Sequence, residues 1–225
     1  MSKESESECE AVQLQYKIII LGDGAVGKTS IALRQTEDMF SNTYKQTIGL
    51  DFFLRRLTLS ENTPVTLQIW DIGGQSIGGK MLRNYIYGAQ AVLLVYDITN
   101  YESFQNLEDW YQLVWRTFGQ DSLPYIALVG NKSDLNHMRA VSEEKHKQFV
   151  LESHLHSFQV SAKTGDHVDS MFCQIAADLA GIKLSKNELE AQIPVLRAQI
   201  INHTQDDPDV KNPGIRAKER GCQLQ

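Results

Sequence analysis

The amino-acid sequence predicts an α/β domain: a mostly parallel six-stranded sheet with one antiparallel edge hairpin and helices on both faces. Short apolar runs alternate with amphipathic stretches through most of the 225 residues, and a sheet wrapped by helices gives that alternation. The runs at 52–59 and 65–70 alternate polar with apolar residues, and only the turn-forming segment 61–64 separates them. This pair predicts the antiparallel hairpin.

The other elements follow in order along the chain. Residues 16–21 form a buried strand that ends at a glycine-rich turn, and a helix begins near Gly27. After the hairpin, further strands are predicted at 91–96, 125–129 and 158–160. The last helix of the domain has an apolar stripe at helical spacing that would pack on the sheet. The stripe consists of Val168, Met171, Phe172, Ile175 and Leu179.

Composition divides the chain into three parts. Residues 1–15 are rich in serine and glutamate and predict a disordered, acidic N-terminal tail. The folded domain is expected at 16–182, and 183–225 is expected to be a variable C-terminal tail. Within that tail, 184–201 has a helical pattern that Pro194 would end or kink.

Charge and cysteine content narrow the class of protein. A net charge of -6 without a basic run argues against a nucleic-acid partner. Three widely spaced cysteines, Cys9, Cys173 and Cys222, favour a reducing compartment over a disulfide framework. No apolar run approaches the roughly 20 residues of a membrane-spanning helix.

The segment 22–29, GDGAVGKT, follows the first predicted strand and matches the phosphate-binding pattern G-x-x-x-x-G-K-[ST]. Glycines let successive backbone N–H groups turn toward phosphate oxygens, and the helix start adds its positive end. The lysine reaches the β- and γ-phosphates, and the threonine hydroxyl binds Mg²⁺. The residues expected to contact this group are Gly22, Gly24, Ala25, Val26, Gly27, Lys28, Thr29 and Ser30. The pattern predicts a nucleoside triphosphate without choosing between GTP and ATP.

Two further loops, each directly after a predicted strand, point to guanine. A carboxylate in the first loop can accept hydrogen bonds from the ring N–H and exocyclic amine of guanine, which adenine does not offer in that arrangement. The second loop would supply a backbone N–H to the guanine carbonyl and a lysine stem to the ring. The residues expected to contact or organise the base pocket are Asn131, Lys132, Asp134, Ser161, Ala162 and Lys163.

In number, order and spacing, these segments together with Thr47 and 71–75 resemble the small GTPases of the Ras superfamily over about 16–182. Segments at 48–52, 67–71 and 85–89 resemble the Rab family in particular. The resemblance implies a P-loop GTPase domain that binds GTP or GDP with Mg²⁺, hydrolyses GTP slowly and acts as a switch in membrane and vesicle traffic.

The resemblance also assigns roles to single residues. It implies that Thr29, Thr47 and Asp71 hold Mg²⁺, and that Lys28, Thr47 and Gln75 serve catalysis, with Gln75 orienting the attacking water. Other roles fall on the Gly74 N–H, which would contact the γ-phosphate, and on Phe40, which would stack on guanine. The aromatic residues that effectors would contact are Phe52, Trp70 and Tyr85; ordinary core packing is the alternative explanation for these three.

The segment after Asp71 departs from the usual Rab pattern. Gly73, Ser76 and Gly78 stand where Rab proteins carry alanine, glutamate and an aromatic residue, and the added glycines give this switch segment unusual backbone freedom. A nucleotide-locked scaffold with negligible turnover therefore remains an alternative. A P-loop kinase or ATPase is a second alternative, which the loop at 131–134 disfavours.

The C-terminal residues 222–225, CQLQ, fit a C-a-a-X signal with a farnesyl-type last residue, which predicts prenylation of Cys222. A free cysteine in a loose tail is the alternative. By resemblance, the partners are an exchange factor, a GTPase-activating protein, effectors, a prenyl-binding carrier and a membrane surface, and the protein is a monomer. The expected location is the cytoplasm and the cytoplasmic face of membranes, with cilium-associated or endosomal membranes suggested.

Overall fold

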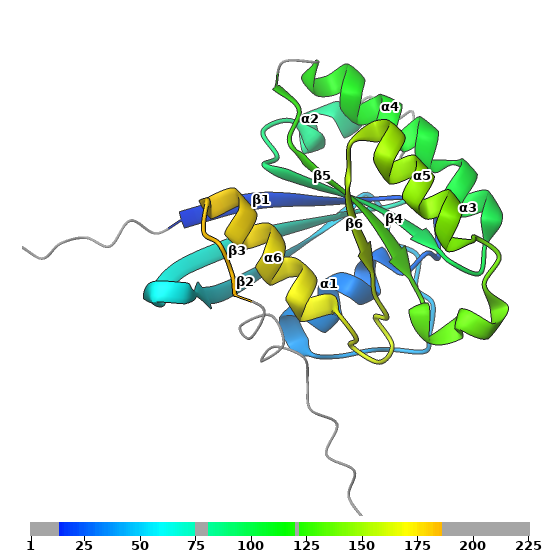
Figure 1. The fold of residues 1–225 in the computed structure, drawn as a ribbon, viewed down its shortest axis with the longest axis horizontal. Coiled ribbons are helices and arrows are strands. Elements are labelled where there is room, and N and C mark those ends of the chain that lie inside the picture. The colour runs from blue at the N-terminus through cyan, green and yellow to red at the C-terminus, as the bar shows by residue number, and fades with distance from the viewer. Residues whose placement is uncertain (1–13, 75–80, 120–121, 186–225) are drawn as a thin grey trace, which may run out of the picture. The chain divides into compact units, whose positions relative to one another are not determined.

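The computed structural model describes residues 14–74, 81–119 and 122–185, all of which belong to one compact unit, Met1–Pro194. Its centre is a six-stranded sheet in the order β2-β3-β1-β4-β5-β6 (Figure 1). Neighbouring strands are parallel except β2 and β3, which are antiparallel, so the predicted sheet is confirmed. The strands are β1 (Leu14–Leu21), β2 (Leu50–Leu59), β3 (Thr63–Ile72), β4 (Ala91–Asp97), β5 (Tyr125–Asn131) and β6 (His156–Gln159).

The hairpin turn is shorter than the sequence suggested. The 3-10 helix η1 (Ser60–Asn62) connects the two strands, and Thr63 and Pro64 already pair with β2. Pro64 is tolerated because pairing of β3 with β1 begins only at Val65, so the missing N–H removes no hydrogen bond on that side.

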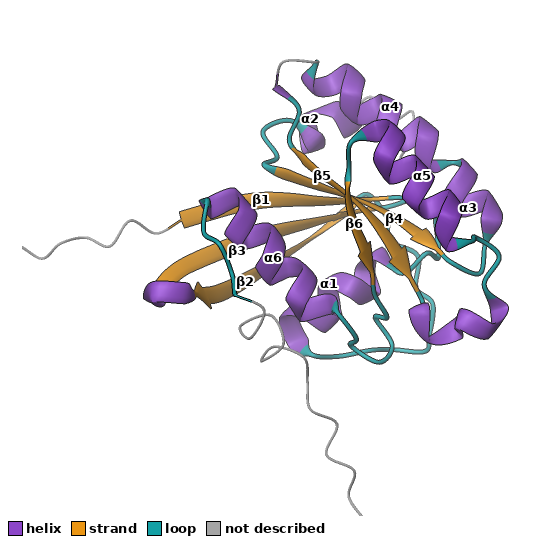
Figure 2. Ribbon diagram, in the orientation of Figure 1, coloured by secondary structure: helices purple, strands orange, loops and turns teal. Residues whose placement is uncertain are grey.

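Helices cover both faces of the sheet, as predicted (Figure 2). Alternate residues of β1 point to opposite faces: Ile18 and Ile20 belong to one buried cluster, and Ile19 and Leu21 to the other. The first cluster includes the stripe predicted for α6 and packs against α1 and α6, and the second packs against α2 to α5. The helices are α1 (Lys28–Glu37), α2 (Leu82–Ile86), α3 (Tyr101–Gln105), α4 (Leu107–Phe118), η3 (Ser133–Met138), α5 (Glu143–Ser153) and α6 (Val168–Ala180).

The parallel strands place several loops at one edge of the sheet. Because β1, β3, β4, β5 and β6 run in the same direction, the segments that follow their last residues converge there. Ligands of open α/β sheets bind in the crevice at this carboxyl edge. Among the described residues, no helix is long and apolar enough to cross a membrane.

Candidate nucleotide-binding site

A cavity of about 910 Å³ opens at this carboxyl edge. Three segments that the sequence singled out contribute to it: the loop after β1 with the start of α1, the loop after β5, and the loop after β6. The predicted site residues in its wall are Gly24, Ala25, Gly27, Lys28, Thr29, Ser30, Phe40, Thr47, Gly74, Asn131, Lys132, Asp134, Ala162 and Lys163. Gly22, Val26 and Ser161 lie outside the wall and hydrogen-bond to residues in it.

The loop after β1 needs glycine at two positions for steric reasons. Gly22 has a φ of +140°, and a β-carbon there would lie 2.1 Å from the carbonyl oxygen of Val95. Gly27 has a φ of +98°, and a β-carbon there would lie 2.3 Å from Nδ2 of Asn131. A side chain at either position would therefore push the loop away from β4 or from the loop after β5.

Lys28, the first residue of α1, places a buried ammonium group in this loop. Its Nζ donates hydrogen bonds to the carbonyl oxygens of Gly22 at 2.8 Å and Asp23 at 2.6 Å. Burial lowers the pKa of Lys28 to about 8, against the attraction of Asp71 and Asp23, which raises it. A bound polyphosphate would supply the negative charge that favours the protonated form of this lysine.

Thr29, Thr47 and Asp71 converge beside this lysine although they come from three separate segments. The Thr29 hydroxyl donates to Oδ2 of Asp71 and lies 2.9 Å from the Thr47 hydroxyl, which is 3.3 Å from the same Oδ2. Asp71 is fully buried, and its Oδ1 has no hydrogen-bond partner among the described residues. Burial raises the pKa of Asp71. Two hydroxyls and a carboxylate with one unused oxygen fit a hard divalent cation such as Mg²⁺.

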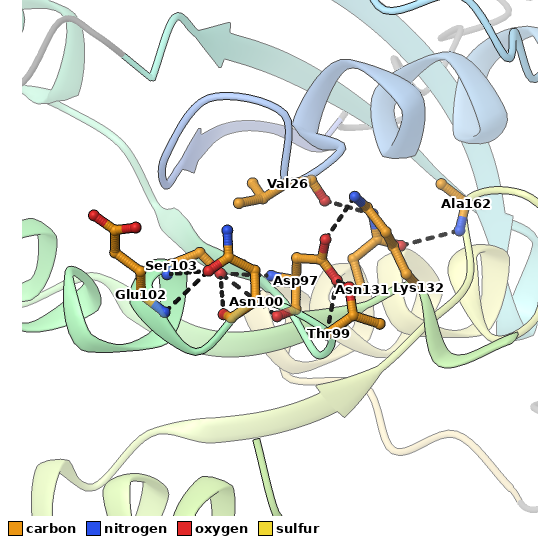
Figure 3. Close-up of polar contacts among 9 residues, drawn as sticks. All are labelled: Val26, Asp97, Thr99, Asn100, Glu102, Ser103, Asn131, Lys132 and Ala162. Atoms are coloured by element: carbon orange, nitrogen blue, oxygen red, sulfur yellow. Dashed lines mark hydrogen bonds and ion pairs between the residues drawn. The ribbon is translucent and has the colours of Figure 1, made fainter. Parts of the chain in front are cut away.

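Asn131 joins three loops, as Figure 3 shows. Its Nδ2 donates to the Val26 carbonyl at 2.8 Å, and its Oδ1 accepts the Ala162 N–H at 3.1 Å. The side chain is buried, with 1% of the residue exposed. One side-chain amide group thus connects the loop after β1, the end of β5 and the loop after β6.

The predicted base-contacting side chains are also held in place. Ser161, which is fully buried, donates its hydroxyl to Oδ1 of Asp134 at 2.6 Å, so this carboxylate is oriented by the loop after β6. Phe40 is half-buried, lines the cavity and packs against the cluster beneath α1 and α6. Asp134 and Phe40 therefore line the same cavity as the phosphate loop, and Ser161 supports Asp134 from outside its wall.

Asp97, the last residue of β4, is a site residue that was not predicted from the sequence. Its Oδ2 pairs with Nζ of Lys132 at 2.6 Å, and its Oδ1 accepts the backbone N–H and the hydroxyl of Thr99 (Figure 3). Lys132 itself has a positive φ of 67°. A polar residue that ends a parallel strand next to the loop of a predicted site was the signal available in the sequence.

The three predicted effector-contacting aromatics occupy different environments. Phe52 pairs with Trp70 across the hairpin, and their rings meet edge to face at 5.6 Å between centroids. Phe52 is 49% exposed, whereas Trp70 and Tyr85 pack against the second core cluster. The ammonium of Lys17 lies 4.4 Å from the centre of the Trp70 ring. Core packing thus explains part of the role of Trp70 and Tyr85, whereas Phe52 is exposed enough for a partner to contact it.

The glycines after β3 make close contacts. The Gly73 N–H donates to the Gly49 carbonyl at 2.9 Å, and a β-carbon at Gly73 would lie 2.5 Å from the Thr47 carbonyl oxygen. A β-carbon at Gly74 would lie 2.3 Å from the Gly24 backbone nitrogen. These two glycines therefore let the segment after β3 lie against the segment at 47–49 and against the loop after β1. Gln75, Ser76, Gly78 and Cys222 lie outside the described residues.

Comparison with known proteins agrees with this arrangement. A model of the Ras family matches residues 17–181, and the chain belongs to this family of small GTPases. It is 46% identical over 186 residues to the Ras-related protein Rab-28 of Caenorhabditis elegans, an alignment that covers 82% of this chain and 75% of the relative. The predicted resemblance to the Rab family is therefore confirmed.

Membership in this family has general consequences. Small GTPases of the Ras type bind GTP or GDP with Mg²⁺, hydrolyse GTP, and work with regulators and effectors, and Rab-type members are associated with membrane traffic.

Proposed function

We propose that this protein is a GTP/GDP switch that hydrolyses GTP slowly with Mg²⁺ and regulates vesicle traffic through effectors. One observation carries the proposal: the Lys28 ammonium, Thr29, Thr47 and the loops after β5 and β6 line a single cavity, and the buried Asp71 carboxylate accepts hydrogen bonds from both threonine hydroxyls. A polyphosphate, a divalent cation and a purine base would each find complementary groups there.

In the proposed mechanism, the base, the phosphates and the cation each contact a different set of these residues. Asp134, oriented by Ser161, accepts hydrogen bonds from the ring N–H and amine of guanine, and Phe40 stacks on the ring. Lys28 and the N–H groups of the loop after β1 bind the phosphates. Thr29, Thr47 and Asp71 would hold Mg²⁺, which neutralises charge on the phosphate oxygens. Gln75 places the water that attacks the γ-phosphate.

Thr47 and Gly74 are the proposed elements of the conformational switch. Both line the cavity, and Gly73 connects their segments through its hydrogen bond to the Gly49 carbonyl and through a backbone approach to Thr47 that leaves no room for a β-carbon. Loss of the γ-phosphate removes the group that Thr47 and the Gly74 N–H both contact in this proposal. The two segments then relax and release effectors that contact Phe52, Trp70 and Tyr85.

Single-turnover hydrolysis of bound GTP tests the enzymatic part. The wild-type rate should be on the order of 10⁻⁴ to 10⁻² s⁻¹, because no arginine among the described residues lines the cavity, and an activating protein should raise it. Gln75→Leu should slow hydrolysis while GTP stays bound, and Thr29→Asn should leave a GDP-bound or empty protein. Hydrolysis too slow to measure in every form, with tight binding intact, would instead favour the nucleotide-locked scaffold.

The membrane part of the proposal rests on the predicted tail. We propose a G domain at 16–182, flanked by tails at 1–15 and 183–225, with a farnesyl group on Cys222 and exchange between cytosol and membranes, because one prenyl chain anchors only marginally. Mass spectrometry of protein from eukaryotic cells should find the added farnesyl and the loss of residues 223–225. An intact C-terminus, with membrane association unchanged in Cys222→Ser, would contradict this step.

The partners are best sought with the two nucleotide-state variants. Proteins that bind Gln75→Leu and not Thr29→Asn are effector candidates, and an exchange factor should prefer Thr29→Asn. Wild type loaded with GDP is the matched control for both captures. Partners that bind all forms equally would contradict a role for this protein as a nucleotide-dependent switch in traffic.

A further inference from the structure

Arg34, in the second turn of α1, connects that helix to the loop after β6, far away in the sequence. Its Nε donates to the Ala162 carbonyl at 3.0 Å, and its Nη2 donates to the Lys163 carbonyl at 2.8 Å. Only 16% of the Arg34 side chain is exposed. The loop thus receives two parallel hydrogen bonds from one planar guanidinium group, a geometry that lysine cannot reproduce.

The same guanidinium also contacts the end of α1. Nη1 donates to the Asp38 carbonyl at 3.0 Å and to Oδ1 of Asp38 at 2.8 Å. Asp38 caps α1 with a positive φ of 52° and precedes Phe40 by two residues. Arg34 therefore ties the loop after β6 to the segment that carries the predicted stacking residue. In Figure 1, α1 and α6, the helix that follows this loop, lie on the same face of the sheet.

Peptide geometry connects Arg34 to the cavity. The Ala162 carbonyl and the Lys163 N–H belong to one planar trans peptide unit, so they point in opposite directions. Fixing the carbonyl against Arg34 turns the Lys163 N–H away from α1. Within the described part of the chain this N–H has no acceptor, whereas the Ala162 N–H is held by Asn131 and the Thr164 N–H by Ser161. Ala162 and Lys163 both line the cavity.

We infer that Arg34 is a positioning residue for base specificity: it orients the Lys163 N–H to donate a hydrogen bond to the 6-oxo group of a purine nucleotide. The inference rests on the proposed function, because it assumes that the base lies between Phe40 and this loop. It adds that recognition of the 6-oxo group depends on α1, while recognition of the 2-amino group depends on Asp134.

Three nucleotides separate these two recognition steps. GDP carries both groups, inosine diphosphate keeps the 6-oxo group and lacks the amine, and 2-aminopurine riboside diphosphate keeps the amine and lacks the 6-oxo group together with the ring N–H. Displacement of a fluorescent GDP analogue gives the affinity of each for the wild type, Arg34→Lys and Arg34→Met, the last retaining an unbranched apolar stem. Arg139→Lys is the matched control, because Arg139 also donates to a backbone carbonyl, that of Val141, but makes no contact with the loop at 161–163.

Both Arg34 variants should bind GDP and inosine diphosphate about 10- to 100-fold more weakly, the size of one lost or misaligned hydrogen bond in a closed site. Their affinity for the 2-aminopurine nucleotide should change less than about threefold. The Arg139→Lys protein should keep the wild-type ratio of the affinity for GDP to the affinity for the 2-aminopurine nucleotide. The ratio is measured within each variant, so it does not depend on the fraction of protein that folds.

Two outcomes would overturn the inference. Equal weakening of the binding of all three nucleotides would show that Arg34 supports the fold without selecting the base, and unchanged affinities for all three in both Arg34 variants would show no role in recognition. A wild-type protein that does not prefer GDP over the 2-aminopurine nucleotide would instead contradict the guanine site of the proposed function. The two failures are therefore distinguishable.

Discussion

Replacing Asp23 by alanine tests how the phosphate loop is held against the sheet. Asp23 is the second residue of this loop, and its carboxylate accepts hydrogen bonds from Nε1 of Trp110 at 3.0 Å and Nδ2 of Asn106 at 2.7 Å. Trp110 is fully buried in α4, so its N–H would lose its only hydrogen-bond acceptor among the described residues. Asn106 is less confined and can bond to water instead.

The magnitude follows from these two contacts. A stranded, buried N–H costs about 1–3 kcal/mol, and a hydrogen bond to a charged acceptor contributes about 1.5–3 kcal/mol. Since Asn106 recovers part of its bond from water, Asp23→Ala should lower the free energy of unfolding by about 2–4 kcal/mol. In a domain of this size that corresponds to a fall in Tm of roughly 5–15 °C.

A double-mutant cycle identifies the contact responsible. Trp110→Phe removes the indole N–H while keeping a large apolar ring, and urea unfolding of all four proteins at one fixed, saturating GDP concentration gives the free energies. The coupling between the two positions should exceed about 1 kcal/mol. If the losses in the free energy of unfolding of the two single variants add up to that of the double variant within about 0.3 kcal/mol, Trp110 does not hold the loop through Asp23.

Three further perturbations probe other parts of the domain. Asp134→Asn should lower GTP affinity sharply and partly restore binding of xanthosine triphosphate, and an unchanged GTP titration would remove Asp134 from the base pocket. Gln35 is buried with neither polar atom partnered among the described residues, so Gln35→Leu should stabilise the GDP-bound protein by about 1–2 kcal/mol in urea unfolding, and a loss of stability would contradict this. Burial, and secondarily Arg139, lowers the pKa of His146 to about 4. Since the unfolded histidine takes up its proton near pH 6.5, stability should fall by about 1 kcal/mol from pH 7.5 to 5.5, and much less in His146→Gln, which a parallel pH series would check.

The fold was largely predictable because its signals are local. The apolar runs of β1, β4 and β5 are buried on both faces and stand out in the sequence. The edge strand β6 was placed two residues late, at 158–160 instead of His156–Gln159, because its first residues are exposed and polar. An edge strand that begins with exposed polar residues has no apolar pattern to mark its first residue.

The site could be predicted from the sequence only where its functional residues form a motif of consecutive positions. Segments such as 22–29 and 131–134 combine a fixed spacing with a preceding strand, so the sequence alone shows them. Arg34 meets Ala162 across 128 positions and Asp23 meets Trp110 across 87, and no spacing rule connects such pairs. The glycine at position 73 predicts backbone freedom, yet a β-carbon there would also clash with the Thr47 carbonyl, so the position requires glycine for space.

The loops of this site are held together by a few side chains, each of which serves two segments. Asn131 joins the loops after β1 and β6, Asp23 joins the loop after β1 to α4, and Arg34 joins α1 to the loop after β6. Because these contacts are polar and lie around a large cavity, a bound nucleotide would stabilise the loops that bind it, and the measured stability would rise with its concentration. Weakening one such side chain should therefore speed nucleotide release more than it disturbs the sheet, because the apolar clusters that hold the sheet consist mainly of strand and helix residues on its two faces.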